Sequence, residues 1–128
     1  MVKEKFPSFH LDPKSNFGYS ITMTDCIFCK IAAKKMPTEI LYEDDHVVVF
    51  KDIHPKARIH LLMVTKEHIQ NLSEFPPEKS DLAAHLLLLL PKIAAIVGLT
   101  DGFRTVINTG HGGGQEIDHL HFHLLGGN

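Results

Sequence analysis

Three features are missing from this sequence, and each absence excludes a class of protein. The longest uninterrupted leucine run, Leu86 to Leu90, has five residues and ends at Pro91, whereas a membrane-spanning helix needs ~20 apolar residues. The first 22 residues contain no continuous apolar stretch of the kind found in an export signal. We therefore expect neither a membrane span nor secretion, and the cytoplasm is the expected compartment.

A charge excess is also missing. The 128 residues include 13 Lys and Arg and 15 Asp and Glu, which gives a net charge of −2 with neutral histidines. This balance predicts no nucleic-acid-binding face and no acidic tail. A composition of 44% hydrophobic and 22% charged residues is that of an ordinary globular domain, and the length suits one such domain.

Cysteine is scarce as well, because only Cys26 and Cys29 are present. A reducing compartment disfavours a structural disulfide between them. The C-x-x-C spacing leaves three readings open: half of a zinc site, a redox pair, or two small buried residues.

The pattern of apolar residues predicts one folded domain over residues 23–128, preceded by an extension over residues 1–22 that carries no clear period. A short helix is expected over 26–34 with Asp25 as N-cap, and a long one from an N-cap at Ser80 to a stop at Gly98. The long helix has apolar residues in steps of three and four, and Pro91 predicts a kink in it. Strands are expected over 39–42, 47–50, 59–65, 103–108 and 119–125. Short connections favour an α+β fold with a five-stranded, mainly antiparallel sheet.

What the sequence does have is histidine, ten in all, with three at alternate positions of HLHFHLL. In a strand, His119, His121 and His123 share one face, ~6–7 Å apart, while the intervening apolar residues face the core. A solvent-exposed edge is the plain interpretation of such a row. The preceding TGHGGGQ instead favours a phosphate-bearing ligand, because glycine lets backbone N–H groups approach an anion.

Imidazole chemistry then indicates phosphoryl or nucleotidyl transfer. One neutral imidazole can attack phosphorus, a protonated one can neutralise phosphate oxygens, and a third group can protonate the leaving atom. This scheme needs no metal. His60 lies on another alternating strand and could face the same cleft.

The stretch GGGQEIDHLHFHLLGG resembles the active-site signature of the histidine triad family. The blocks CIFCKI, YEDDHVVVFKDIHPKARIH and FRTVINTG agree with that family in order and spacing, so the resemblance covers residues 25–127. The ending LLGG is more similar to the nucleoside phosphoramidase branch than to the dinucleoside polyphosphate branch. The resemblance implies a homodimer whose two sheets join into one, with a purine nucleotide site on each subunit.

It also implies a mechanism. His121 would attack the α-phosphorus of a nucleoside 5′-phosphoramidate, an amine would leave, and water would release AMP from nucleotidylated His121. The catalytic residues would be His121, His123 and His119. The ligand would be AMP, GMP or a phosphoramidate. Some relatives carry serine at the position of Glu116, where it helps the leaving group. The implied nucleotide-binding residues are Ile27, Phe28, Ile31, Phe50, Asp52, Ile53, Asn108, Gly114, Gln115, Glu116, His121 and His123.

Some histidine triad relatives hold structural zinc with a C-x-x-C pair and two histidines. The resemblance implies that Cys26, Cys29, His60 and His119 would form this site here, since two thiolates and two imidazoles suit tetrahedral zinc. Several functions stay open: phosphoramidate hydrolysis, dinucleoside polyphosphate hydrolysis, a non-catalytic nucleotide-binding module, and an enzyme in which the histidine row binds a catalytic metal.

Overall fold

A computed structural model of the chain describes residues 26–127, and the expected extension 1–22 and the Asp25 cap lie outside them. The strands are β1 (Ile40–Glu43), β2 (Val47–Lys51), β3 (Ile59–Thr65), β4 (Arg104–Val106) and β5 (His121–Gly126). The α-helices are α3 (Ile27–Ala32) and α4 (Ser80–Ile96). Three short 3-10 helices also lie within residues 26–127: Leu72–Glu74, Pro77–Lys79 and His111–Gly113. No helix among these residues is long and apolar enough to span a bilayer.

The five strands form one sheet in the order β1-β2-β3-β5-β4, and all four pairings are antiparallel. This confirms the α+β fold expected from the pattern. β3 is the central strand and β5 lies beside it, with Leu62 opposite His123 and Val64 opposite His121. The register therefore carries the histidines of β5 onto the same face as Leu62 and Val64.

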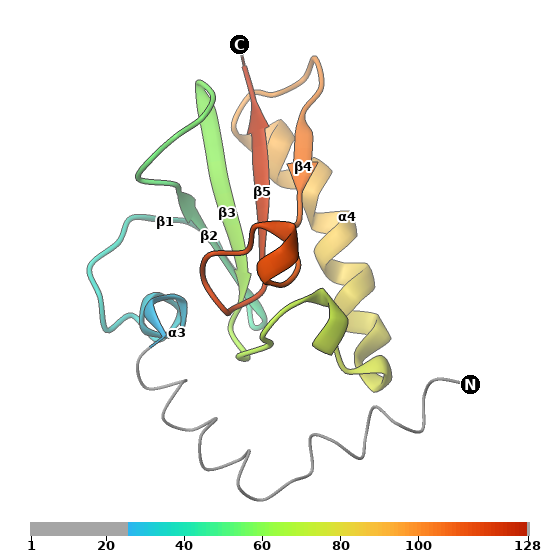
Figure 1. The fold of residues 1–128 in the computed structure, drawn as a ribbon. Helices are drawn as coiled ribbons and strands as arrows, with labels where there is room; N and C mark the ends of the chain where they lie inside the picture. Colours follow the sequence, from blue (N-terminus) through green and yellow to red (C-terminus); the bar gives the residue numbers. More distant parts are fainter. Residues whose placement is uncertain (1–25, 128) are drawn as a thin grey trace, which may run out of the picture.

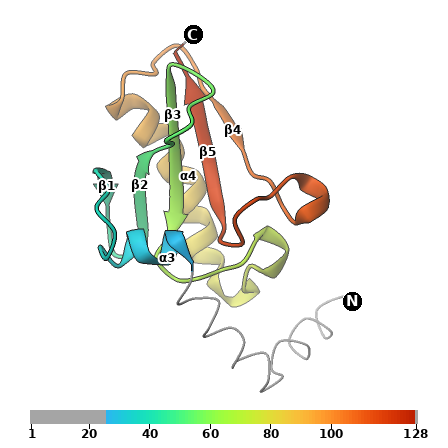
Figure 2. The same ribbon diagram turned by 60° about the vertical axis from the view of Figure 1, so that its left-hand side comes forward.

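The two faces of the sheet are covered unequally. α4 runs along the back face of the sheet in Figures 1 and 2. Its Leu86, Leu89 and Ile93 pack against a core that includes Leu120, Phe122 and Leu124. On the front face, α3 places Phe28 and Ile31 against strands β2 and β3. The apolar half of HLHFHLL thus anchors the strand, as its alternation predicts.

The helix ends differ in detail from the expected ones. Lys79, not Ser80, is the N-cap of α4, because the 3-10 turn Pro77–Lys79 runs directly into the helix. Cys26 caps α3, and its Sγ accepts the N–H of Cys29. Gly98 ends α4 with a φ of 87°, as predicted. Near its end, α4 buries Ile93 and Ala94 against the sheet, and Ile96 lies on the exposed side of the helix.

Candidate active site and metal centre

The three histidines of HLHFHLL share the front face but differ in their surroundings. His119 precedes β5 and is fully buried, His121 begins β5 and is 7% exposed, and His123 is partly exposed. Phe28 on α3 closes one side of the row, with its ring 5.1 Å from that of His121 and in an edge-on orientation. The row is therefore not a solvent-exposed edge.

His121 has one ring nitrogen fixed by the backbone. Its Nδ1 lies 2.7 Å from the carbonyl oxygen of His119. Since a carbonyl can only accept, Nδ1 must carry the proton. In the neutral ring, Nε2 then holds the free lone pair. The backbone thus selects the tautomer in which Nε2 can act as a nucleophile.

A second chain of hydrogen bonds orients His123. The backbone N–H of Lys56 donates to Nδ1 of His60 over 3.0 Å, so the proton of neutral His60 is on Nε2. That Nε2 lies 2.9 Å from Nδ1 of His123 and 3.3 Å from Oδ2 of Asp52. His60 therefore donates to His123, whose own proton is placed on Nε2.

Burial keeps His123 uncharged. It lowers the pKa of His123 to about 4, and repulsion from His121 and His60 acts in the same direction. Burial also lowers the pKa of His60, against the opposing attraction of Asp52. Near pH 7 the free protein thus offers a neutral N–H donor at His123, where we had expected imidazole chemistry to use a protonated ring.

The residues expected around the base divide into buried and exposed ones. Phe28, Ile31 and Phe50 are at most 6% exposed and pack among β2 and β3, so their main role is in the core. Ile27 and Ile53 are 40% and 85% exposed. These two apolar side chains are therefore the ones that remain free to contact a ligand.

Asp52 and the glycine-rich loop complete the site. Oδ1 of Asp52 accepts the N–H of His54, which fixes the carboxylate after β2. Nδ2 of Asn108 donates to the carbonyl of Gly113, which leaves its second N–H available. Gly114 has a φ of 83°, a conformation that suits glycine, and a Cβ there would come 3.7 Å from Nδ2 of Asn108.

Gln115 braces this loop from inside. Its side-chain NH₂ donates to the carbonyls of Gln70 and Ile117, and its side-chain oxygen accepts the N–H of Gly110. The amide is buried, and both its oxygen and its nitrogen are already hydrogen-bonded. Any contact with phosphate oxygens thus falls to the loop backbone and Asn108. Glu116, next in the chain, is exposed.

A second cluster lies at the other end of the row. The ligand atoms of Cys26, Cys29, His68 and His119 lie within 4.8 Å of one another. The sulfur of Cys26 is 3.2 Å from Nδ1 of His119, and that of Cys29 is 3.1 Å from Nδ1 of His68. These four residues could hold a metal ion such as zinc, because two sulfurs and two imidazole nitrogens match a closed tetrahedral site.

The expected ligand set is corrected at one position. His68, not His60, accompanies the two cysteines and His119, while His60 belongs to the group with Asp52 and His123. We had expected His60 from its place on β3. It lies near the start of β3, whereas His119 lies by Thr65 at the end of that strand. A strand rises ~3.3 Å per residue, so five residues separate the two places by ~16 Å.

His119 is prepared to bind a metal through Nδ1. Its Nε2 lies 2.7 Å from the carbonyl oxygen of Thr65, so the proton is on Nε2 and Nδ1 keeps its lone pair. Burial lowers the pKa of His119 to about 4. Burial, together with the neighbouring Cys26, raises the pKa of Cys29 to about 12. Without a metal, Cys29 is therefore a neutral thiol, whereas a bound cation would favour its thiolate.

This geometry can be compared with known proteins. The family model described as "Scavenger mRNA decapping enzyme C-term binding" matches residues 25–128. Protein HitA of Neisseria gonorrhoeae is 53% identical over 104 residues, which covers 81% of this chain and 97% of that protein. A HIT-like protein of Synechococcus elongatus is 52% identical over 103 residues, or 80% of this chain and 90% of that one.

Solved structures agree with the curated relatives. A HIT family hydrolase from Legionella pneumophila superposes with a TM-score of 0.78 at 42% identity, covering 81% of this chain and 94% of that one. A histidine triad protein from Clostridium difficile gives 0.78 at 44% identity, with 81% and 91% covered. These matches span most of both chains, and the residues matched by the family model include the alternating histidines. The chain belongs to the histidine triad (HIT) family.

Proposed function

We propose that the protein is a nucleotide-binding hydrolase that cleaves the phosphorus–nitrogen bond of purine nucleoside 5′-phosphoramidates. The observation that carries this proposal is the hydrogen bond from Nδ1 of His121 to the carbonyl of His119. It places the proton on Nδ1 and so leaves Nε2 of this buried ring as the nitrogen that can attack phosphorus. The resemblance to the phosphoramidase branch and the hydrolase named among the structural relatives support the same chemistry.

The reaction has two displacements at phosphorus. Nε2 of His121 attacks the α-phosphorus, and the P–N bond breaks as the amine departs, taking up a proton from solvent. Water then attacks the same phosphorus, the bond to Nε2 breaks, and AMP is released as the water's proton returns to solvent. Both steps build negative charge on the phosphate oxygens, and preorganised N–H donors stabilise that charge. His123 Nε2–H, Asn108 and the backbone of the 110–116 loop are our assigned donors.

The nucleoside would lie toward α3 and the end of β2. Asp52 follows β2, and its carboxylate can accept both ribose hydroxyls. Ile27 and Ile53 would contact the two faces of the base, since they are the exposed apolar residues on that side. Phe28, Ile31 and Phe50 would form the floor beneath it. Gly114, Gln115 and Glu116 would shape the loop around the phosphate.

We also propose that the Cys26, Cys29, His68 and His119 cluster holds structural zinc. A metal there would supply no reacting group, because all four tetrahedral positions are filled by protein ligands. His119 links the cluster to catalysis: its ring faces the sulfurs, while its carbonyl holds His121. The metal would thereby fix the nucleophile's orientation.

A panel of adenosine derivatives tests this function. We expect AMP release from adenosine 5′-phosphoramidate, with a slower reaction on diadenosine polyphosphates, measured by chromatography of the products. Faster cleavage of the polyphosphates would instead assign the protein to that class. Tight AMP binding with no turnover of either compound would make it a non-catalytic binding module and would refute the proposed reaction.

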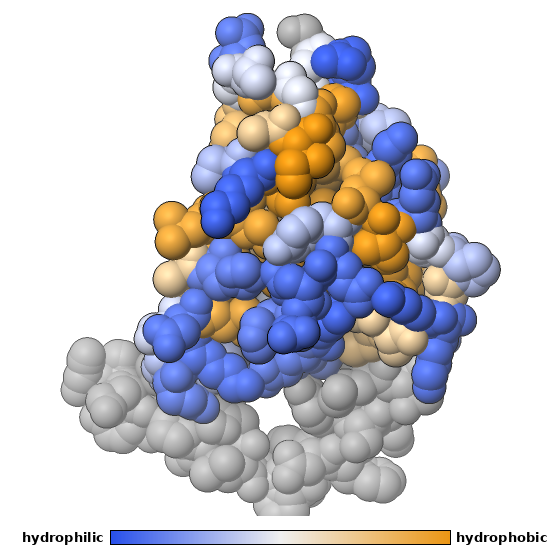
Figure 3. Space-filling view, turned by 180° about the vertical axis from the view of Figure 1, so that it is seen from behind, coloured by the Kyte–Doolittle hydropathy of each residue, from blue (hydrophilic) through white to orange (hydrophobic). Residues whose placement is uncertain are grey.

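We further propose a homodimer formed through β4. β4 is one of the two edge strands of the sheet, so its outer hydrogen-bonding groups are available to a second copy. The face seen from behind carries a broad apolar area in its upper half (Figure 3). Exposed large apolar residues of α4, the helix on this side of the sheet, are Leu87, Leu88 and Ile96. Such a patch beside an open edge is typical of an interface.

The dimer is tested by sedimentation. Wild type should sediment as a dimer, whereas Leu88→Glu should shift the protein toward the monomer by placing charges in the interface. Lys51→Glu adds the same kind of charge at an exposed position of β2, on the other side of the central strand from β4, and this control variant should stay dimeric. A monomeric wild type at micromolar concentration would rule out this assembly.

A further inference from the structure

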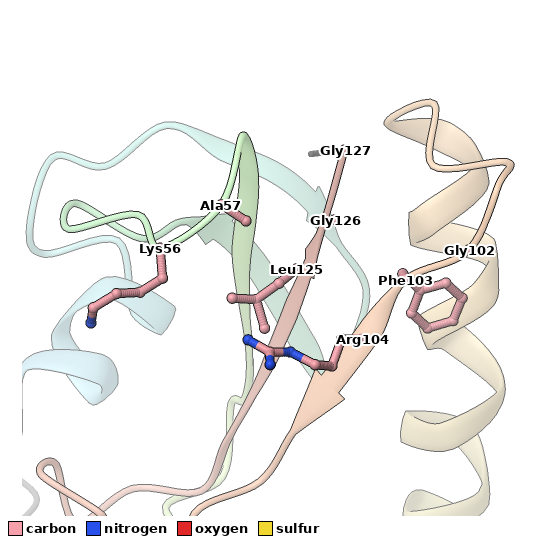
Figure 4. A pocket seen from close by; sticks show the side chains of 8 residues that line it. All are labelled: Lys56, Ala57, Gly102, Phe103, Arg104, Leu125, Gly126 and Gly127. Atoms are coloured by element: carbon pink, nitrogen blue, oxygen red, sulfur yellow. The ribbon is translucent and has the colours of Figure 1, made fainter.

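A cavity of about 410 Å³ lies between the loop before β3, the start of β4 and the end of β5 (Figure 4). It is lined by two cations, two large apolar side chains and small residues, with no acidic residue among them. The lining residues are Lys56, Ala57, Gly102, Phe103, Arg104, Leu125, Gly126 and Gly127. Its volume is within the range of small-ligand pockets.

The strand register joins this cavity to the histidine row. Leu125 is paired with His60 on one side and with Arg104 on the other, and His123 is paired with Val106. Residues two apart on a strand share a face, so Arg104 is on the same face as His123, one step along the sheet. In Figure 4 the Arg104 side chain crosses β5 beneath Leu125 toward β3.

The two cations are electrostatically close to the catalytic groups. The charges of Arg104 and Lys56 both lower the pKa of His60, and that of Lys56 also lowers the pKa of His123. Within residues 26–127 neither cation forms an ion pair. Two positive charges without an acidic partner, in a cavity that also offers Leu125, favour an anionic ligand with a short apolar spacer.

The position indicates which part of a substrate would reach it. In the proposed function the nucleoside lies on the α3 side and phosphorus lies at His121. A displacement at phosphorus requires the leaving group to point away from the attacking nitrogen. The departing group therefore starts on the solvent side of His121. Since the nucleoside occupies the α3 and β2 side in the proposed function, a leaving group long enough to bend along the sheet is left with the β4 side, where Arg104 lies.

We propose that this cavity is a leaving-group subsite in which Arg104, assisted by Lys56, selects amines that carry a terminal anion, either a carboxylate or a phosphate. This proposal rests on the proposed function, because the subsite would bind the amine that His121 displaces. Both cations are exposed, so each contact gives a modest gain.

Two substrates that differ only in the terminal charge of the leaving group measure the contribution of these cations. The phosphoramidates of AMP with β-alanine and with β-alanine amide differ by one charge at nearly equal shape. We expect wild type to show a kcat/KM about three- to fivefold higher for the carboxylate, and Arg104→Gln to bring the ratio close to one. Lys56→Gln should lower the ratio in the same direction. Lys92→Gln, an exposed charge change on α4, should keep the wild-type ratio.

Other results separate the possibilities. A third phosphoramidate, formed with 2-aminoethyl phosphate, distinguishes the two anions. If Arg104→Gln lowers kcat/KM more for this compound than for the β-alanine compound, phosphate is the preferred anion. A wild-type ratio near one, or a ratio unaltered in Arg104→Gln, would overturn the subsite while leaving phosphoramidate hydrolysis intact.

The subsite can also be measured without turnover. Failure of wild type to release AMP from any of the three compounds would refute the proposed function alone. Stable AMP alkyl esters ending in a carboxylate or a carboxamide would then report affinity by calorimetry. Tighter binding of the carboxylate, lost in Arg104→Gln, supports the subsite, and equal affinities refute it.

Discussion

His121→Gln is expected to lower the rate of AMP release from adenosine 5′-phosphoramidate by about a thousandfold or more. Glutamine can preserve a hydrogen bond to the carbonyl of His119, but its amide nitrogen has no basic lone pair with which to attack phosphorus. The loss should appear in kcat rather than in KM, because the nucleotide contacts proposed for Asp52 and Asn108 remain. Stopped-time assays of AMP formation measure it.

The control separates catalysis from folding. His46→Gln changes an exposed histidine in the turn between β1 and β2, away from the row, and should keep wild-type turnover. Both variants should melt within a few degrees of wild type. Undiminished AMP release by a folded His121→Gln protein would show that another group is the nucleophile.

The second large effect concerns the metal centre. Wild type purified with zinc should contain one ion per chain, and His68→Asn should contain little or none. Removing the ion should cost roughly 3 kcal/mol of unfolding free energy under conditions where the free metal exceeds Kd a hundredfold. For a domain of this size that corresponds to a fall of about 10 °C in Tm.

His60→Asn is the matched control for that prediction. Both histidines are buried, at 5% and 3% exposed, so each substitution removes a buried ring of similar size. The geometry predicts that His60→Asn keeps its zinc, because His60 bonds to His123 and Lys56 instead. Metal analysis by atomic emission decides the matter, and zinc retained by His68→Asn but lost from His60→Asn would contradict the ligand set.

Metal loss should also slow catalysis, by about tenfold. The reason is the double role of His119, whose ring faces Cys26 and whose carbonyl holds Nδ1 of His121. Without the ion, the ring of His119 is held mainly by its hydrogen bond to Thr65. The nucleophile would then lose part of its orientation.

The local pattern was enough to predict the fold. Strict alternation in HLHFHLL indicated which side chains face the core, and the structure places Leu120, Phe122 and Leu124 there against α4. The strand over 59–65 has the predicted bounds. These predictions succeed because a half-buried strand has a period of two that the sequence displays directly.

The ligand set required pairing information that a local pattern does not contain. His60 and His68 both lie near β3, one at its start and one just beyond its end. The antiparallel register of β5, with His121 opposite Val64, places His119 next to the end of β3. One sequence signal does favour the later histidine, because antiparallel pairing brings the end of β3 next to the start of β5.

The hydrogen bonds among the histidines also could not be predicted from the sequence. A pattern indicates that His60 and His123 could share a cleft, but it cannot show that His60 donates to His123 while accepting from the Lys56 backbone. Nor does it reveal that the side chain of Gln115 braces the loop from inside. Such assignments depend on which atoms lie within hydrogen-bonding distance.

The central claim is that Nε2 of His121 forms a bond to phosphorus. The most direct measurement is to mix excess adenosine 5′-phosphoramidate with the protein, quench with alkaline denaturant within the first turnover, and analyse peptides by mass spectrometry. We predict one adenylyl group on the peptide that contains His121, assigned to that residue by fragmentation and absent from His121→Gln. Rapid AMP release with no labelled peptide at any quench time, or a label on another residue, would contradict the account.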